Sequence, residues 1–520
     1  MLPDGVMITR REFLATSASS LLSLNLLGCS GGSPPLRGVS FSAADYQALP
    51  ILGLATSLPE EHDYEATVEG RIPAQLRGTL YRNGPGLFER NGLRKRCLLD
   101  GDGMVQAFRI DDGRVRFQNR FVRTQKYLEE SAAGRFLNAT WSTQAPGGFW
   151  TNLGRTSFKN QAGVSVVVRE GRLFAFDEFH PPYELDPDTL ETIGESWLGV
   201  KEGSTVFSAH SKLDPLNGDW LFYGLEYGPE TRLHLTVLGQ DGLLKKHQAI
   251  PLPRTAYIHD FFVSDRHFIF NLPPMEIRPL PFLFGQKSMT DSMRWAPEKG
   301  NLLLVVPRDE NRAPVQMFTE AAWMWHALNA YEEGGQIIAD FVGYRNPDHF
   351  IGKDPALFAV MEGRQGDYRF PGEIRRYVID PARQRVAQET MDGGNYEFPY
   401  VNPRLSCHRH RFGYFISIVR GEAFFTSVVR FDTHTGKSEG YDFGPGIYCS
   451  EPVFAQEPGF AYLGGGAQEP GWLMTEVYDS HKHKSSLAIF QAEALGNGPV
   501  ATVHLRHHVP LGFHGFWQGA

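Results

Sequence analysis

Short apolar or alternating runs, each closed by a turn signal, recur from about Tyr46 to the C-terminus. Runs of this kind are typical of β-strands, and the Gly, Pro, Asn and Asp residues between them are typical of tight turns. Strand-turn units kept up over such a length fit a β-propeller or a very large barrel, because both close one core from many similar sheets. No strict repeat motif sets the number of blades. The clearest predicted strands lie at 78–85, 105–110, 172–176, 268–270, 302–306 and 427–431.

One segment, Thr319–Glu333, carries a helical pattern instead. Its apolar residues fall at helical spacing, and Gly334-Gly335 follows as a helix stop would. We therefore expect a helix there. No low-complexity linker divides the chain after Tyr46, so residues 46–520 are expected to form one domain.

The first 29 residues are interpreted as an export leader that takes no part in the fold. Thr9-Arg10-Arg11-Glu12-Phe13-Leu14 is close to a twin-arginine signal, and the apolar run that ends at Leu27 is too short for a stable membrane span. Leu26-Leu27-Gly28-Cys29 resembles a lipobox, in which the cysteine becomes the lipid-bearing N-terminus. Residues 30–45 are then expected to be a flexible tether.

This leader predicts export by the twin-arginine route to the periplasm or the cell envelope. A lipid on Cys29 would hold the protein at a membrane surface, next to membrane-dissolved substrates. The alternative is a signal peptide that is cut elsewhere, with Cys29 lost.

Composition excludes some classes of function. The formal net charge is −8 and no basic block follows the pattern of a phosphate-binding surface, which argues against nucleic-acid binding. The 37 phenylalanines suit sheet packing, an apolar tunnel, or both. No CxxC pair occurs, so a zinc ribbon or a thioredoxin-type site has no support. With Cys29 used as a lipid site, Cys97, Cys407 and Cys449 allow at most one disulfide.

Four of the 18 histidines share an unusual setting. Each is a single imidazole inside an apolar or aromatic strip, far from the others in the sequence. A neutral imidazole in a dry pocket is a good ligand for a first-row metal ion. We therefore expect these side chains to point inward from different sheets and to meet on an axis. They are His210, His259, His326 and His514.

Three glutamates, Glu178, Glu397 and Glu451, occupy strand-like positions with aromatic neighbours. A carboxylate buried in such a place needs a partner. An imidazole that binds a metal through one nitrogen presents an N–H on the other, and a carboxylate is its common acceptor. The three glutamates are therefore expected to orient metal-binding imidazoles. The alternative for each is an exposed strand residue.

Seven short motifs follow one another across nearly the whole chain after the leader: Tyr81–Gly86, Leu99–Met104, His259–Phe261, His326–Glu332, Glu397–Pro399, Ser450–Pro452 and Phe513–Gly515. This ordered set resembles the carotenoid cleavage oxygenases. The resemblance implies a seven-bladed β-propeller, capped on one face by loops and short helices over an axial metal site. It implies a non-haem Fe(II) bound by His210, His259, His326 and His514, with Glu178, Glu397 and Glu451 orienting three of the imidazoles. The implied reaction uses O2 to cleave a conjugated C=C bond of a carotenoid or apocarotenoid into two carbonyl products.

The ligand count agrees with that chemistry. Four neutral imidazoles leave two positions of an octahedral ion open, enough for O2 with the alkene beside it. Zinc usually takes three protein ligands and a water, so a zinc hydrolase fits less well. Two alternatives remain: a dioxygenase that cleaves a stilbenoid or phenylpropanoid alkene, and a non-catalytic propeller that binds apolar ligands.

Two further features bear on the substrate. Phe179-His180 stands where relatives often have small residues, which affects the shape of the tunnel. Lys126 lies near a stretch that can line the cavity, and in stilbene-cleaving relatives a lysine helps to bind a phenol oxygen. We favour the other interpretation of Lys126, a solvated lysine at a strand end.

Overall fold

The structure is a computed structural model that describes residues 32–155, 158–309, 311–367, 372–419, 421–459 and 469–520. The expected leader, with Cys29, lies outside the described residues. Within the described ranges, no helix combines the length and the apolar character that crossing a bilayer requires.

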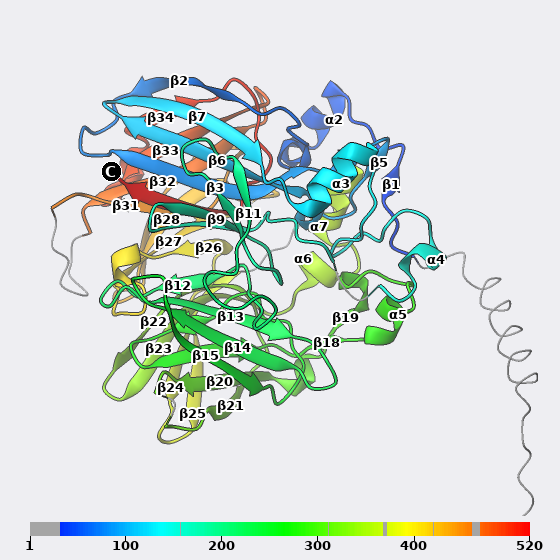
Figure 1. Cartoon of the computed structure of the whole chain (residues 1–520). Coiled ribbons are helices and arrows are strands. Elements are labelled where there is room, and N and C mark those ends of the chain that lie inside the picture. The colour runs from blue at the N-terminus through cyan, green and yellow to red at the C-terminus, as the bar shows by residue number, and fades with distance from the viewer. Residues whose placement is uncertain (1–31, 156–157, 310, 368–371, 420, 460–468) are drawn as a thin grey trace, which may run out of the picture.

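The described strands form a seven-bladed β-propeller (Figure 1). Five blades are separate four-stranded antiparallel sheets, each made from one contiguous part of the chain. They consist of β8 (Ser165–Arg169), β9 (Arg172–Phe176), β10 (Tyr183–Leu185) and β11 (Thr192–Glu195); β12 (Ser211–Leu213), β13 (Trp220–Glu226), β14 (Arg232–Leu238) and β15 (Leu244–Pro251); β16 (Phe262–Val263), β17 (His267–Leu272), β20 (Asn301–Pro307) and β21 (Val315–Thr319); β22 (Trp323–Glu333), β23 (Gln336–Tyr344), β24 (Glu373–Asp380) and β25 (Arg385–Asp392); and β26 (Tyr396–Tyr400), β27 (Phe412–Ser417), β28 (Ser427–Asp432) and β29 (Lys437–Asp442).

The remaining two blades are joined through β2 (Asp63–Gly70), whose two halves pair with a different neighbour each. Residues 67–70 pair with β34, and residues 63–66 pair with β7. One of these blades holds β30 (Ile447–Cys449), β31 (Val453–Gln456), β32 (Gly471–Asp479), β33 (Lys484–Gln491) and β34 (Ala501–His504), and the other holds β3 (Gly78–Leu87), β6 (Asp102–Asp111), β7 (Arg114–Phe121) and β35 (His514–Gly519).

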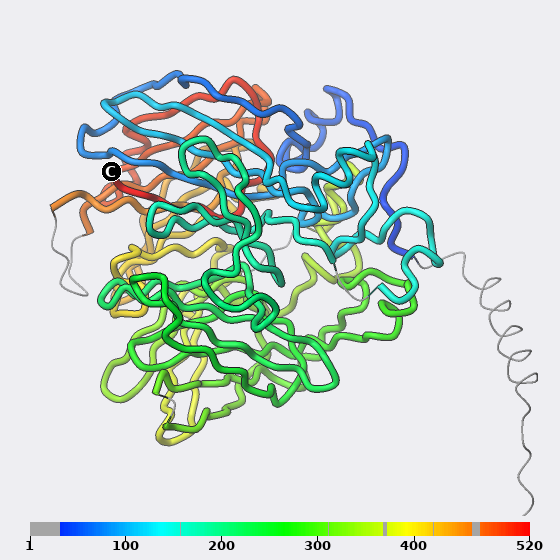
Figure 2. The backbone as a smooth tube through the Cα atoms, viewed as in Figure 1, coloured from blue at the N-terminus to red at the C-terminus, as the bar shows by residue number. Residues whose placement is uncertain are grey.

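The two ends of the chain close the ring. The last strand, β35, pairs antiparallel with β3, so that His514 stands opposite Asn83. Figure 2 shows the first and last parts of the chain interleaved in these neighbouring blades. The C-terminal strand thus supplies the inner strand of a blade whose other strands come from the first part of the chain, and the propeller leaves only short, protected strand edges.

All six of the predicted strands are confirmed, in β3, β6, β9, β17, β20 and β28. Their apolar content follows from their position within a blade. Strand β20 is buried at every residue because blades pack on both of its faces. The outermost strand β15 alternates between exposed and half-buried residues, because only one of its faces meets a neighbouring blade.

The helix expected at Thr319–Glu333 is wrong, because Trp323–Glu333 is strand β22. The first nine residues of β22 are all buried, and a strand covered on both faces shows a continuous apolar run rather than an alternating one. Gly334 and Gly335 both have positive φ and form the turn into β23, not a helix stop.

Short helices and loops gather on one side of the propeller, to the right in Figure 1, and form the cap. A two-stranded sheet of β18 (Met275–Ile277) and β19 (Met293–Trp295) also lies outside the blades. The short strands β1 (Leu36–Arg37), β5 (Leu93–Arg94) and β4 (Glu89–Arg90) make a small further sheet. The helices are α2 (Ala43–Ala48), α3 (Gln125–Ala133), α4 (Phe149–Asn152), α5 (Pro279–Leu283), α6 (Asp348–Ile351) and α7 (Ala356–Ala359).

The flexible tether expected at residues 30–45 is corrected from Ser33 onward. Ser33 is fully buried, its backbone N–H donates to the Gln144 side chain at 2.7 Å, and its Oγ accepts from the Ser288 N–H at 2.9 Å. Leu36–Arg37 and Ala43–Ala48 form β1 and α2. The Ser/Gly/Pro composition predicted a loop. It could not show that the backbone and the hydroxyl group of Ser33 would form hydrogen bonds with residues of the cap.

Candidate active site

Four histidines from four different blades meet on the propeller axis. Their ligand nitrogens all lie within 4.8 Å of one another, and the Nε2 atoms of His210 and His259 are 3.1 Å apart. His259, His326 and His514 are each 8% exposed, and His210 is half-buried. The expected convergence of these four side chains is therefore present.

Each imidazole comes from the innermost part of its blade. His210 immediately precedes β12, and His259 lies in the irregular segment before β16. His326 lies within β22 where the pairing register with β23 shifts. Such a β-bulge re-aims a side chain, here toward the axis. His514 is the first residue of β35 and is held by the closing pair with β3.

Three buried glutamates each contact one imidazole at Nδ1. The distances are 2.5 Å for Glu178 Oε1 to His259, 2.6 Å for Glu397 Oε2 to His326, and 2.8 Å for Glu451 Oε1 to His514. A carboxylate at Nδ1 favours the tautomer with its proton there, so that the Nε2 lone pair faces the centre. The structure thus places each of the three predicted glutamates next to one of the four imidazoles.

Burial keeps part of the cluster neutral. Burial first, and then the neighbouring imidazoles, hold the pKa of His210 and of His326 well below the usual value. Burial also lowers the pKa of His259, but Glu178 outweighs it and raises that pKa. Four imidazoles at this spacing cannot all be protonated, because like charges in a dry site repel strongly.

The donor set fits a divalent metal ion. A metal–nitrogen bond of about 2.1 Å puts neighbouring ligands about 3 Å apart and opposite ones about 4.2 Å apart. The separations of 3.1 Å and at most 4.8 Å are close to that pattern. Neutral imidazoles whose other nitrogen is bound to carboxylates are typical metal ligands.

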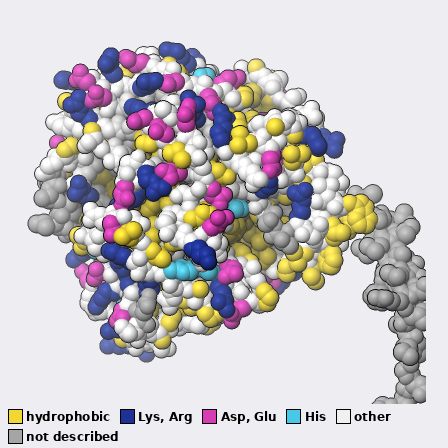
Figure 3. All heavy atoms as spheres, in the orientation of Figure 1, with side chains coloured by type: hydrophobic (Ala, Val, Ile, Leu, Met, Phe, Trp, Pro, Cys, Tyr) yellow, Lys and Arg dark blue, Asp and Glu magenta, His cyan; other side chains and the backbone are white. Residues whose placement is uncertain are grey.

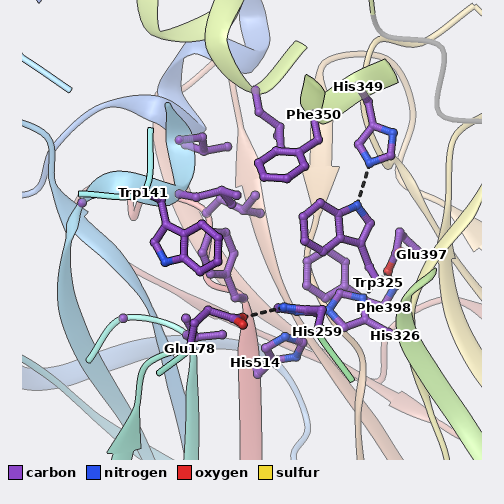
Figure 4. A pocket seen from close by; sticks show the side chains of 18 of the residues that line it. Trp141, Glu178, His259, Trp325, His326, His349, Phe350, Glu397, Phe398 and His514 are labelled. Atoms are coloured by element: carbon purple, nitrogen blue, oxygen red, sulfur yellow. Dashed lines mark hydrogen bonds and ion pairs between the residues drawn. The ribbon is translucent and has the colours of Figure 1, made fainter. Parts of the chain in front are cut away.

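An apolar cavity opens onto one side of the cluster. Figure 4 shows His259, His326 and His514 at one end, with Trp141, Trp325 and Phe350 around the space. Phe398 stacks on His326 with 5.0 Å between ring centroids, from a backbone φ of 48° beside the register shift in β26. A positive φ in a bulky residue is rare and points to a constrained position.

Trp325 and His349 form a contact that the sequence did not reveal. Trp325 Nε1–H donates to His349 Nε2 at 2.6 Å (Figure 4). Burial lowers the pKa of His349 to about 4, so this imidazole is a neutral acceptor. His349 belongs to α6 in the cap and Trp325 to β22, and only the fold brings them together. The one signal available in the sequence was a histidine next to the apolar pair Phe350-Ile351.

A second, more polar cavity is lined by His210, His326 and His514, together with Lys212, Asp260 and Asn329. Asp260 accepts from the Ala327 N–H at 2.9 Å and pairs with Lys212 Nζ at 2.9 Å. Because Asp260 follows His259 and Ala327 follows His326, this carboxylate ties together two of the segments that bear histidines.

Lys126 is neither a cavity residue nor solvated, so both interpretations of it are wrong. It lies in α3, fully buried, 2.6 Å from Asp102 Oδ1 and 3.1 Å from Glu130 Oε2. Burial lowers its pKa, but the two carboxylates outweigh burial and raise it. The Thr124 side chain, which accepts from the Tyr127 N–H, starts this helix and turns Lys126 inward.

Phe179 and His180 do not line the cavity but contact two residues that do, Trp141 and Asp177. Phe179 stacks on Trp141 at 4.9 Å, and His180 Nδ1 lies 3.0 Å from Asp177 Oδ2. Cys97, Cys407 and Cys449 are buried and free, so no disulfide forms among the described cysteines.

Comparison with known proteins identifies the family. The family described as RPE65, Retinal pigment epithelial membrane protein, matches residues 55–519. The chain is 34% identical to the apocarotenoid-15,15'-oxygenase of Synechocystis over 93% of its own length and 99% of the relative's. The chain belongs to the carotenoid oxygenase family.

Two further comparisons show the range of this family. The chain is 28% identical to the isoeugenol monooxygenase of Pseudomonas nitroreducens, over 87% of its own length and 94% of the relative's. It superposes on the crystal structure of the cobalt-substituted Synechocystis enzyme with a TM-score of 0.83 and 32% identity, covering 93% of this chain and 100% of that one. Carotenoid oxygenases depend on non-haem iron, and the four-histidine cluster fits such an ion.

Proposed function

We propose that this carotenoid oxygenase is an Fe(II)-dependent dioxygenase that cleaves a conjugated C=C bond of a carotenoid or apocarotenoid with O2 into two carbonyl products. One observation carries the proposal: four imidazoles meet on the propeller axis, and the three that glutamates orient lie at the end of an apolar cavity. The similarity to the Synechocystis apocarotenoid-15,15'-oxygenase supports it.

In this proposal His210, His259, His326 and His514 hold the iron through nitrogens that face one another. Bound iron supplies the reactivity toward O2 that a closed-shell alkene lacks. Glu178, Glu397 and Glu451 keep the Nδ1 proton of three imidazoles in place and so direct the other nitrogen inward. No acid or base from the protein is required.

The cavity wall selects the bond that reacts. A long apolar alkene is held by ring faces, and the double bond that lies beside the metal is set by where those rings stop the chain. Trp141, Tyr257 and Trp325 form a contiguous set of rings near His259, with centroid distances of 5.3 Å and 6.4 Å from Tyr257 to the two tryptophans.

Two polar side chains of the cavity wall already bind protein groups, which favours a polyene over a phenolic alkene at those two positions; Gln161 Oε1 has no partner among the described residues. The Asp177 carboxylate is already bound by the N–H groups of Gln161 at 3.0 Å and Glu178 at 2.9 Å, and by His180. His349 accepts from Trp325. These groups would have to break protein contacts to bind a phenol hydroxyl, at a cost of about 1–3 kcal/mol each. The similarity to the isoeugenol monooxygenase makes a phenylpropanoid alkene the second candidate substrate.

Product analysis tests the proposal. The full-length protein, loaded with Fe(II), is given an apocarotenal, a carotenoid, a hydroxystilbene and isoeugenol under 18O2, and the aldehydes are identified by mass spectrometry. We expect about one iron per chain and labelled aldehydes from a polyene. Zinc or no bound metal, or no labelled oxygen in either product, would contradict the dioxygenase; cleavage of the phenolic alkenes alone would assign the second candidate.

We also propose that the protein works at a membrane surface. Exposed apolar side chains gather on α4 and α5, where Figure 3 shows a hydrophobic area: Trp150, Leu153, Leu280 and Phe284, which are 65, 40, 62 and 51% exposed. Below this area, Phe282 contacts Phe158 at 5.4 Å, and Phe158 stacks on Trp141 in the cavity wall at 6.1 Å. An apolar path of this kind suits a substrate taken from lipid.

Export and lipid attachment at Cys29 belong to the same proposal, because the leader motif predicts both. Flotation of the full chain with lipid vesicles tests the surface, and Trp150→Ser with Phe284→Ser is expected to weaken flotation. Export is tested by fractionating cells that carry Arg10→Lys with Arg11→Lys, which should retain the protein in the cytoplasm. Normal export of that variant, or no change in lipid labelling on Cys29→Ala, would contradict this assignment.

A further inference from the structure

Arg82 lies fully buried at the point where the blade that closes the ring meets the metal site. It belongs to β3, and its register partner on β35 is Gly515, the residue after His514. A buried guanidinium is costly unless several acceptors surround it. The acceptors that Arg82 uses therefore show what its position stabilises.

Each acceptor lies in a segment that carries a member of the site. Nη1 donates to the backbone carbonyl of Glu451 at 2.9 Å. Nη2 donates to Ser450 Oγ at 2.9 Å and to the Gly512 carbonyl at 3.3 Å. One planar group thus binds the residue next to Glu451, Glu451 itself, and a residue two positions before His514.

The two segments that Arg82 bridges also contact each other. Glu451 Oε1 accepts from His514 Nδ1 at 2.8 Å, and its Oε2 accepts from the Gly515 N–H at 2.7 Å. The geometry of this contact depends on how the two backbones are placed, and the fork of Arg82 ties both. A lysine would keep the charge but could not span three acceptors in one plane.

Glu476 on β32 is the acidic neighbour of Arg82, with Oε2 3.5 Å from Nε and no hydrogen bond between them. Replacing a buried ion pair by apolar side chains is often neutral or stabilising, so stability alone does not account for this pair. An apolar residue could not supply the directional hydrogen bonds that Arg82 donates to the Glu451 and Gly512 segments, so these bonds are the feature that requires arginine.

We propose that Arg82 is a positioning residue for the metal site, which sets His514 by holding the Glu451 and Gly512 segments in register. The proposal rests on the assignment of the four histidines as metal ligands. Arg82 acts through Glu451 and His514 and touches neither the ion nor the substrate.

A double-mutant cycle on metal affinity tests it. Co(II) affinity of the full chain is measured by chelator competition, together with the cobalt absorption spectrum and the thermal unfolding midpoint. We expect Arg82→Lys to weaken Co(II) binding about 10–100-fold, the range for residues that orient a metal ligand. Because Arg82 acts through Glu451, the double variant Arg82→Lys with Glu451→Gln should bind Co(II) only slightly more weakly than the weaker-binding of the two single variants. With Glu178→Gln, which acts on His259, the losses should multiply.

Arg94→Lys is the matched control. Arg94 is also almost fully buried and donates to two backbone carbonyls, those of Met361 and Ala55, but in the cap. This variant should lower the unfolding midpoint and leave Co(II) affinity unchanged. A general loss of rigidity would instead weaken binding in both variants.

Three results would overturn the proposal: wild-type Co(II) affinity in Arg82→Lys, a loss that multiplies fully with that of Glu451→Gln, or an equal loss in Arg94→Lys. If Arg82→Lys does not fold, Ser450→Ala removes one acceptor, and unchanged affinity in that variant would overturn the proposal as well. A wild-type protein that binds no metal would contradict the proposed function instead.

Discussion

At the scale of residues, the site is built from pairs of side chains, and the role of each side chain is clear only when its partner is known. His514 depends on Glu451, His326 on Glu397, and Trp325 on His349. Pairing explains why a buried imidazole is stable here: each N–H that leaves water finds an acceptor. It also predicts how single substitutions separate metal binding from substrate positioning.

Replacing His514 by alanine is expected to abolish iron binding while the protein stays folded. The imidazole is one of four ligands, but the β3–β35 pairing that it belongs to is made by backbone groups and remains. Iron content and circular dichroism measure the two effects. An enzyme that keeps its iron and full activity would show that His514 is not a ligand.

Trp325→Phe should leave iron content unchanged and lower kcat/KM about 10-fold, with a shifted ratio of cleavage products. The variant removes the hydrogen bond to His349 and frees a ring that packs edge-on to His259 at 5.0 Å. Trp472→Phe is the control, because Trp472 is buried in β32 and does not line the cavity. Equal effects of the two substitutions would mean that Trp325 acts through stability alone.

At the scale of elements, the segment between β34 and β35 packs through histidines against the segment before β2 and against the turn between β32 and β33. His507 stacks on His62 at 4.0 Å and His508 stacks on His483 at 4.4 Å. Burial lowers the pKa of both His507 and His508 to about 4, so the folded protein binds a proton on these rings at a lower pH than the unfolded chain does.

Stability should therefore fall as the pH drops from about 6.5 toward 4. The unfolded chain takes up these protons near pH 6.5 and the folded protein near pH 4, so the contribution of the neutral rings is complete above pH 6.5 and lost below. We expect a loss of about 2 kcal/mol for each imidazole, allowing for their partial exposure. Urea unfolding of metal-free protein between pH 7.5 and 4 measures it. His508→Gln should flatten the dependence, while His481→Gln, in an exposed turn, should not; a flat wild-type profile would contradict this reasoning.

At the scale of the whole molecule, one strand pair both closes the ring and completes the metal site. Strand β35 contributes an edge to the blade of β3 and carries His514 at its first position. The inner strands on either side, β8 and β31, contact β35. Loss of the whole strand is therefore expected to remove metal binding together with closure.

Deleting residues 514–520 should leave a chain that is metal-free and far less cooperative in thermal unfolding. The truncation exposes the edge of β3 and opens the ring, which favours aggregation. Deleting Ala520 alone removes one backbone hydrogen bond to Arg77 and should be close to neutral. Size-exclusion chromatography and calorimetry compare the two. A truncated protein that remains monomeric with an unchanged midpoint would show that closure adds little.

The sequence alone predicted much of the fold and of the candidate site. Strand-turn units marked an all-β body, and the motifs singled out the four histidines and three glutamates that the structure brings together. These signals are local, since each lies in a strip of a few residues whose composition shows burial. Thr319–Glu333 was misread for the same reason, because a short apolar run does not distinguish a strand buried on both faces from a helix.

Tertiary structure decided everything that depends on which distant segments meet. Composition near Lys126 could not show that Asp102 and Glu130 would enclose it, and nothing local linked Arg82 to Ser450 and Gly512, hundreds of residues away. His349 reaches Trp325 only because the cap folds over the axis. The residues next to a side chain in the sequence predict whether it is buried. The partner that it contacts, and therefore its role, depends on which distant segments the closed propeller brings together.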